Sequence, residues 1–139
     1  MASLSESVRA NAKDWPRRIG WTLSGLAILF LAMDSVMKLL ALPVVVETGA
    51  TLGFRGVDTA RALGTVLAVC TVLYAYPRTA ILGAVLLTGY LGGAVATHVR
   101  AGNPLLSHVL FGVYVGAFVW AGIYLREPRL RTLIPVRKT

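Results

Sequence analysis

Two pairs of opposite charges are the groups in this sequence whose types and spacing come closest to those of a functional site. Asp34 and Lys38 are four residues apart, a spacing that puts both side chains on one face of a helix. Asp58 and Arg61, three residues apart, share a helical face for the same reason. Such charges either neutralise each other as structural ion pairs or line a wet pocket that binds a ligand, and the sequence leaves both alternatives open.

Two histidines are the other candidates. His98 and His108 lie on either side of a short connection, so both imidazoles are expected to face one cavity. With Asp34 or Glu47 they would offer ligands to a metal ion. Their spacing matches no metal motif, such as two histidines four residues apart on one helix. We therefore predict no metal site, and we expect the imidazoles to hydrogen-bond a ligand or a carboxylate.

The elements that must position these groups are long apolar segments. Each is close to the roughly 20 residues that a helix needs to cross the hydrocarbon core of a membrane. The apolar runs are continuous and lack the alternation of barrel strands, which favours helices. We therefore predict an all-α fold, a transmembrane four-helix bundle, with spans at residues 19–42, 57–76, 79–99 and 105–125.

The composition agrees with this fold class. The sequence has 139 residues, of which 56% are hydrophobic and 14% are charged. Soluble domains carry about 25% charged residues, and a soluble core of this size does not hide so much apolar surface. Because four spans and short connections use nearly the whole chain, we predict a single domain over residues 1–139. Any chemistry must sit among the helices or come from a partner, so we do not expect an enzyme on its own.

The net charge of +8 is distributed unevenly over the predicted connections. Arg55 and Arg100 lie in the connections on one side. The basic residues on the other side are Arg9, Lys13, Arg17, Arg18, Arg78, Arg126, Arg129, Arg131, Arg137 and Lys138. By the positive-inside rule both termini are cytosolic, and Glu47 and Asn103 are outside. We interpret the charges as a topology signal that attracts anionic lipid and expect no nucleic-acid partner, because no reading motif is present.

With this topology, the polar residues of the spans and outer connections fall at one depth, near the outer face of the membrane. A charge within a span costs about 2.5–3.5 kcal/mol at the bilayer centre, so such residues pair or face a wet cavity. We therefore predict an outward-facing ligand site. Its candidate residues are Asp34, Lys38, Glu47, Asp58, Arg61, His98, Arg100 and His108.

The connection between the first two spans is predicted to hold a short interfacial helix. Pro43 suits the first turn of a helix, and Gly49 or Gly53 suits its end. The apolar residues between them favour a position at the membrane surface. The polar segment before Ile19 lacks the pattern of a signal peptide, and we expect a short, mobile tail on a retained first helix.

Small residues recur at a helix-packing spacing in the last two spans, as Gly89-x-x-x-Gly93 and Gly112-x-x-x-Gly116. Small residues four apart let helix backbones approach closely in lipid. These contacts are predicted to lie inside the chain, with a homodimer face as the alternative. The aromatic residues predicted to form a belt at the cytosolic interface are Trp15, Trp21, Tyr74, Tyr76, Trp120 and Tyr124.

Several runs of this sequence resemble the DoxX-like membrane proteins. The most specific are LGAVLLTGYLGGAVATHVR at residues 82–100, PLLSH at 104–108 and WAGIYLR at 120–126, followed by Pro128 to Arg131. DSVMKL at residues 34–39 and Leu52 with Gly53 also fit, so the resemblance extends over about residues 21–135. It implies a compact four-helix bundle in the bacterial cytoplasmic membrane.

The resemblance leaves two hypotheses about function. DoxX-like relatives include a subunit linked to thiosulfate oxidation by quinone, a component of a mycobacterial redox complex, and distant animal proteins that assist receptor assembly. One hypothesis is an accessory redox subunit that binds a quinone or another small amphipathic molecule, including a lipid, beside an oxidoreductase partner. The other is a noncatalytic assembly protein that acts through helix–helix contacts. The sequence has one cysteine, Cys70, and no haem-ligand pattern, which argues against independent electron transfer.

The predicted topology can be tested with single cysteines. Because the basic residues lie mainly on one side, a membrane-impermeant thiol reagent added outside cells should label Asn103→Cys and spare Ser5→Cys. The reverse labelling pattern would place the polar site at the cytosolic face.

Overall fold

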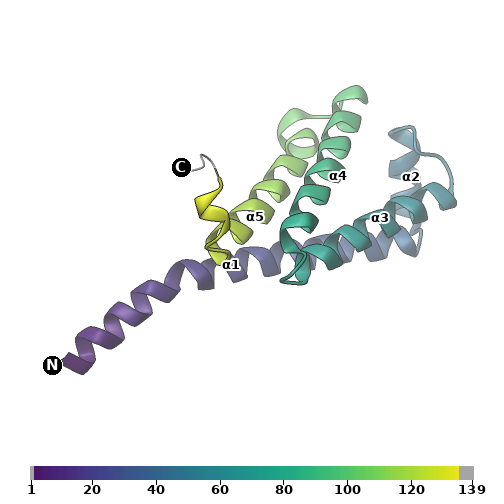
Figure 1. Ribbon diagram of the computed structural model, residues 1–139. Helices are drawn as coiled ribbons and strands as arrows, with labels where there is room; N and C mark the ends of the chain where they lie inside the picture. Colours follow the sequence, from purple (N-terminus) through teal and green to yellow (C-terminus); the bar gives the residue numbers. More distant parts are fainter. Residues whose placement is uncertain (1, 135–139) are drawn as a thin grey trace.

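The structure is a computed structural model, and it describes residues 2–134, with the side chains of Ala2 and Lys13 left out. The described chain is helical and contains no strand (Figure 1). Its elements are α1 (Ala2–Leu39), α2 (Pro43–Thr51), α3 (Val57–Ala75), α4 (Ala80–Arg100), the π-helical turn η1 (Leu105–Val109), α5 (Phe111–Arg126) and the 3₁₀ turn η2 (Leu130–Thr132).

Four of these segments are long and apolar enough to cross a membrane: Ser3–Leu39, Val57–Ala75, Ala80–Arg100 and Leu105–Arg126. They pack in a ring in which α1 contacts α3 and α5, and α4 closes the ring between them. The short helix α2 begins with Pro43 in its first turn and lies between the first two spans. The predicted transmembrane four-helix bundle with a short helix after the first span is confirmed.

Two predicted boundaries differ from the structure. The segment before Ile19 was expected to be a tail, but α1 is continuous from Ala2 and carries Pro16 within it. The fourth span was expected to be one helix from Leu105, but it opens with η1, where the amide of Leu110 bonds the carbonyl of Leu105 at 2.9 Å. Local hydropathy identifies a span, but it does not show whether the backbone hydrogen bonds of that span have α-helical or π-helical spacing.

Close backbone approach joins α1 to α5 near the end of the bundle where α5 finishes. A Cβ added to Gly122 would lie 2.5 Å from the hydroxyl oxygen of Ser24, and one added to Gly20 would lie 2.7 Å from the amide nitrogen of Arg126. Gly83 in α4 lies against the backbone of Tyr74 in α3 in the same way. Small residues at these positions let helices touch where hydrophobic exclusion does not drive them together.

Tyr74 is the centre of this closed end. Its side chain is 0% exposed, and its hydroxyl donates to the carbonyl of Val119 at 2.8 Å. The same oxygen lies 2.9 Å from the hydroxyl of Ser24, so one phenol connects α1, α3 and α5. The expectation that Tyr74 belongs to an aromatic belt at the membrane surface is therefore wrong, because a belt residue would face lipid and water.

Arg126 supports the same end of the bundle. It is buried, and its guanidinium carbon lies 4.5 Å from the centre of the Trp21 ring and 5.0 Å from that of Tyr74. Its Nη2 donates to the backbone carbonyl of Tyr74 at 3.1 Å, one of the acceptors left open at the end of α3. A cation at this position also complements the negative end of the α3 dipole.

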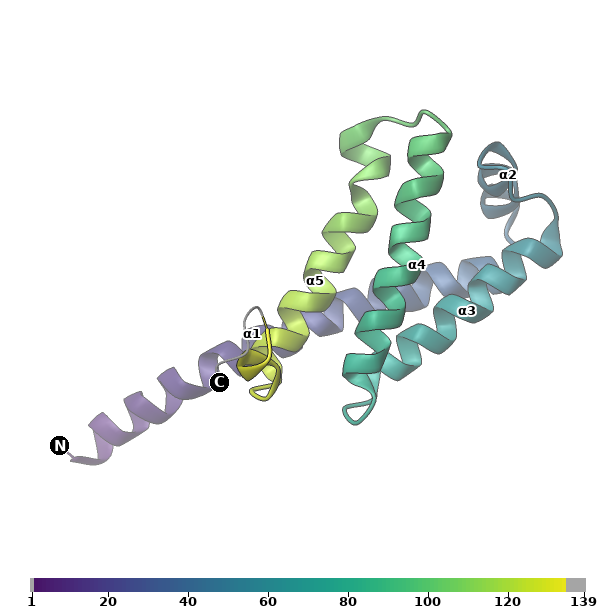
Figure 2. The ribbon, with the colours of Figure 1, turned by 45° about the horizontal axis from the view of Figure 1, so that its top comes forward.

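At the other end of the bundle, the helices separate as two pairs. Gly64 of α3 stays against Lys38 of α1, and Gly112 of α5 lies against Val95 of α4. Between the pairs the backbone is open, because a Cβ added to Gly89 or Gly93 would meet nothing within 4 Å in the described chain. Figure 2 shows α4 and α5 rising away from α1 and α3 toward this end. The prediction that Gly89 and Gly93 pack within the chain is not met, whereas Gly112 does pack there.

The close packing at this end of the bundle predicts that alanine substitutions at two glycines of α1 differ strongly in their effect on stability. Gly20→Ala should destabilise the protein by about 1–3 kcal/mol, because the new methyl group would overlap backbone atoms of α5. Gly25→Ala is the matched control, since nothing lies within 4 Å of its added Cβ. Thermal unfolding in detergent measures both, and equal melting temperatures for the two variants would contradict the packing described here.

Candidate functional site

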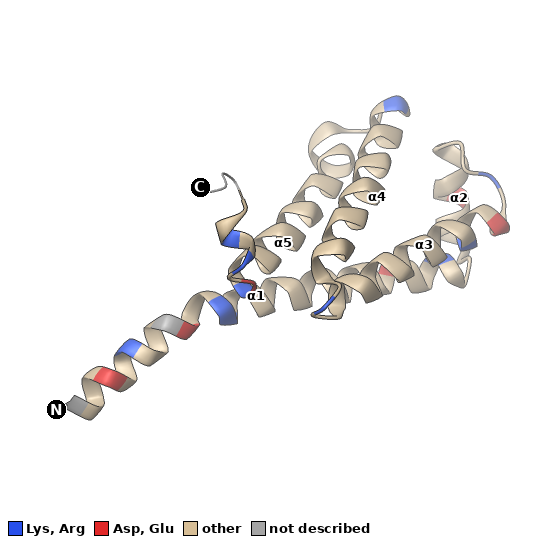
Figure 3. Cartoon of the chain, in the orientation of Figure 1, with Lys and Arg blue, Asp and Glu red and all other residues tan. Residues whose placement is uncertain are grey.

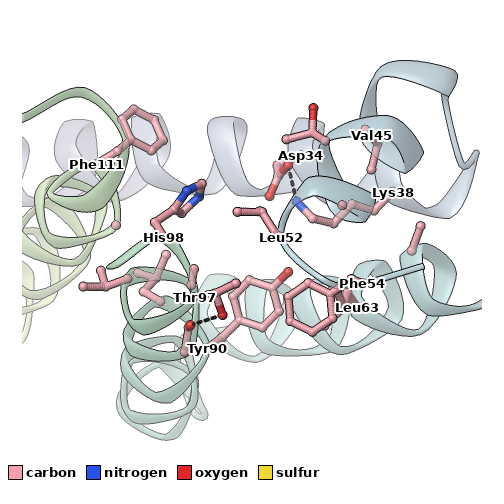
Figure 4. A pocket seen from close by; sticks show the side chains of 18 of the residues that line it. Asp34, Lys38, Val45, Leu52, Phe54, Leu63, Tyr90, Thr97, His98 and Phe111 are labelled. Atoms are coloured by element: carbon pink, nitrogen blue, oxygen red, sulfur yellow. Dashed lines mark hydrogen bonds and ion pairs between the residues drawn. The ribbon is translucent and has the colours of Figure 1, made fainter. Parts of the chain in front are cut away.

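A cavity of about 620 Å³ lies where the two helix pairs separate. Side chains of α1, α3, α4, η1 and α5 form its walls, and α2 with the loop after it closes one side (Figure 4). Most of its surface is apolar. The main apolar lining residues are Phe30, Leu31, Met37, Val45, Leu52, Phe54, Leu63, Leu91, Val95, Phe111 and Val115. The polar side chains of the wall therefore stand out as the groups that would orient a ligand.

Asp34 and Lys38 are the charged groups of the wall. They form an ion pair on one face of α1, as their spacing predicts, and it is the one ion pair among the residues that the structure describes. Their side chains are 31% and 20% exposed, respectively. Mutual neutralisation lowers the cost of placing both charges within a span. The pair also keeps polar atoms beside an otherwise apolar cavity.

His98 and His108 both line the cavity, so the expectation that the two imidazoles face one cavity is confirmed. Their ring centres lie 5.9 Å apart. The amide nitrogen of Asn103 lies 2.8 Å from His98 Nδ1, and because an amide nitrogen only donates, Nδ1 accepts and the proton is on Nε2. His98 therefore presents an N–H donor from Nε2.

His108 lies in the π-helical turn η1 and lines the cavity. Pro104 offers its carbonyl to the amides of both His108 and Val109, at 3.1 and 3.3 Å, which widens the first turn of the fourth span. The hydroxyl of Ser107 lies 2.7 Å from His108 Nδ1 and fixes one edge of the ring. Single π-helical turns often occur at functional sites.

Tyr90 is a wall residue that the sequence reasoning missed. It lies on α4 and lines the cavity, and Figure 4 shows its hydroxyl pointing toward the side of the cavity where Asp34 and Lys38 lie. Within the described chain, this hydroxyl makes no hydrogen bond, whereas the hydroxyl of Tyr74 makes two. A phenol left free beside an apolar cavity is a donor and acceptor available to a ligand. An isolated tyrosine in an apolar run gives no pattern by which the sequence could have identified it.

The remaining predicted site residues lie outside the cavity wall. Glu47, Asp58 and Arg61 are exposed, and no ion pair joins the latter two within the described chain. Arg100 is also exposed, but its Nη2 donates to the carbonyl of Leu52 at 2.6 Å. Because Leu52 lines the cavity directly after α2, this bond holds the covering segment to the end of α4.

Potential metal ligands do not cluster in the described chain. Over residues 2–134, no group of three or more histidine, cysteine, aspartate or glutamate side chains is close enough to hold a metal ion. The two histidines of the wall have their Nδ1 atoms engaged by Asn103 and Ser107.

Fold and site together define a multi-pass membrane protein, embedded in the lipid bilayer, with a cavity between its helices. A profile of the DoxX-like family matches residues 22–122, which run from within the first span to near the end of the fourth. The chain belongs to the DoxX-like family. Neither a curated protein nor a solved structure matches the chain.

A double-mutant cycle tests the ion pair of the wall. Asp34→Asn or Lys38→Met alone leaves one charge without its partner in a partly buried position, so each should destabilise more than the double variant does. We expect a coupling of about 0.5–3 kcal/mol from thermal unfolding in detergent. Strictly additive losses would mean that the two charges act separately at the cavity.

Proposed function

We propose that the cavity binds a small amphipathic molecule, such as a quinone or a lipid-like compound, and that the protein is an accessory subunit of a membrane redox system. The observation that carries the proposal is an apolar cavity of about 620 Å³ with a few polar side chains on its wall. Ligand sites commonly have volumes of about 300–1,000 Å³ and this kind of lining. The redox part rests on the DoxX-like relatives, and it calls for an oxidoreductase partner.

The polar groups of the wall suit a ligand head that accepts hydrogen bonds. His98 presents its Nε2–H and Tyr90 an unpaired hydroxyl, and both are able to donate to a carbonyl oxygen. The ring of a quinone or the body of a lipid-like molecule would occupy the apolar part of the wall around Leu91 and Phe111. The ligand would then be held by shape and burial, and oriented by the donors.

The proposed setting is the bacterial cytoplasmic membrane, with both termini cytosolic and the cavity near the outer face. The charge distribution supports this orientation. Basic residues gather around the amino-terminal part of α1, the α3–α4 turn and the end of α5 (Figure 3). On the cavity side, Arg100 ends α4 and Arg55 follows α2. Short cytosolic connections are enriched in Lys and Arg.

The second candidate is an assembly protein that acts through helix–helix contacts, with a membrane partner or a second copy of the chain. The observation that favours it is the surface of α4, where Gly92 is exposed and an added Cβ would meet nothing within 4 Å in the described chain. Small residues on a lipid-facing surface allow close helix contact. Binding of a small molecule to the cavity is the result that separates the two candidates.

Ligand binding should raise the melting temperature of the purified protein. At a ligand concentration of 100 times Kd, binding to the folded state adds about 2.7 kcal/mol of stability. A water-soluble quinone analogue should therefore produce a clear shift in the wild-type protein. His98→Ala and His108→Ala should abolish the shift, and Tyr90→Phe should reduce it without lowering the basal melting temperature, because its hydroxyl bonds no group in the described chain.

Arg61→Gln is the matched control, since Arg61 is exposed and outside the cavity wall. It should keep the full shift. If neither a quinone analogue nor a short-chain phospholipid shifts the wild type, or if the shift survives both histidine substitutions, the cavity does not bind as proposed and the assembly function is the better account.

A further inference from the structure

The amino-terminal part of α1 projects beyond the other helices of the described chain (Figure 1). α1 has 38 residues, and at about 1.5 Å per residue it is far longer than the roughly 30 Å of hydrocarbon that a span must cross. Gly20 lies in close contact with α5. Residues 2–18 form the part of α1 that extends past the other described helices (Figure 1).

This segment carries an exposed apolar stripe. Leu4, Val8 and Trp15 are 70%, 67% and 67% exposed, respectively. Their spacing of four and seven residues places them on one face of the helix. Burying three large apolar side chains on one face of a helix is favourable, so this stripe favours an apolar environment over water.

Charged residues, most of them basic, lie on the other faces of the same segment. Arg9 and Arg17 are eight residues apart and lie on a face away from the stripe, which they share with Glu6. Residues 2–18 contain four basic residues (Arg9, Lys13, Arg17 and Arg18) and two acidic ones (Glu6 and Asp14), so the segment has a net charge of +2. Arg18 adds a cation where α1 enters the bundle. An apolar stripe on a helix of net positive charge is typical of a segment that lies in the surface of a membrane containing anionic lipid.

Pro16 lets the segment leave the direction of the span. It lies inside α1 and has no backbone N–H, so the carbonyl four residues before it, on Ala12, loses its helical hydrogen bond. Helices bend most readily at such positions. The bend would fall between the apolar stripe and Arg17, where the chain passes from the membrane surface into the span.

We propose that residues 2–15 form an interfacial helix that bends at Pro16 and lies on the anionic leaflet from which α1 enters the bilayer. Leu4, Val8 and Trp15 insert into the acyl boundary, and Arg9 and Arg17 contact lipid phosphates. Membrane is favoured over a protein partner because the bilayer surface adjoins the segment where α1 emerges and because the net charge of +2 on residues 2–18 complements an anionic leaflet. The helix fixes the tilt of α1 relative to the membrane independently of what the cavity binds.

Spin labelling of the full-length protein tests this proposal. In a Cys70→Ala background, Leu4→Cys, Val8→Cys and, as the matched control, Arg9→Cys are labelled with a nitroxide. Each variant is reconstituted in vesicles of phosphatidylcholine mixed with phosphatidylglycerol and in vesicles of phosphatidylcholine alone. Collision with oxygen reports exposure to lipid, and collision with a water-soluble nickel complex reports exposure to water.

In the anionic vesicles, the ratio of oxygen to nickel collisions should be several-fold higher at Leu4→Cys and Val8→Cys than at Arg9→Cys. That difference should shrink in phosphatidylcholine alone or at high salt, since screening weakens the attraction. Three water-exposed labels in both vesicle types would mean that the helix projects into solution and would overturn the proposal. Labels at Leu4→Cys and Val8→Cys shielded from both reagents would overturn it in favour of a protein partner.

Discussion

The architecture depends on the enclosure of Tyr74 where three helices meet. In lipid there is little hydrophobic drive to bring helices together, so association relies on close packing and on hydrogen bonds between helices. The Tyr74 hydroxyl makes two of the bonds that cross between helices at this point, to Ser24 and to the Val119 carbonyl, and Arg126 donates a third to the Tyr74 carbonyl. Gly122 and Gly83 have no side chain, which lets the backbones of neighbouring helices pack closely around Tyr74. The bundle is consequently fixed at one end and free to separate at the other.

The cavity is the consequence of that separation. The pair α1 and α3 stays in contact through Gly64 and Lys38, and the pair α4 and α5 through Gly112 and Val95, but the pairs diverge from each other. Polar groups that would be expensive in lipid are placed around the resulting space, where they face one another or the cavity. Arg100 then holds the segment after α2 across one side by its bond to the Leu52 carbonyl.

The spans, their number and the ion pair of α1 could be predicted because each depends on local sequence: a continuous apolar run, or two charges one helical turn apart. Which glycines pack against a neighbouring helix could not be predicted. Gly89-x-x-x-Gly93 and Gly112-x-x-x-Gly116 have the same spacing, but only the latter includes a residue in close backbone contact. Which motif packs is decided by the direction in which helices diverge, and no single segment encodes that direction.

The candidate site shows the same limit. The sequence brought His98 and His108 together correctly, because a short connection joins their helices, although the π-helical turn that contains His108 was not foreseen. It grouped Glu47, Asp58 and Arg61 with them by depth alone, and these side chains lie on the outside. Depth within a membrane restricts a residue to a layer, whereas membership of a cavity wall depends on rotation about the helix axis. Tyr90 was missed for this reason.

The most direct test of the cavity as a ligand site is the anomalous scattering of a bromine-substituted naphthoquinone in a crystal structure of the protein. The account predicts a bromine peak inside the cavity bounded by Tyr90, His98 and Phe111, with a ligand carbonyl oxygen in hydrogen-bond reach of His98 Nε2. A bromine peak confined to the lipid-facing surface of the helices, with the cavity filled by the side chains of α2, would contradict it.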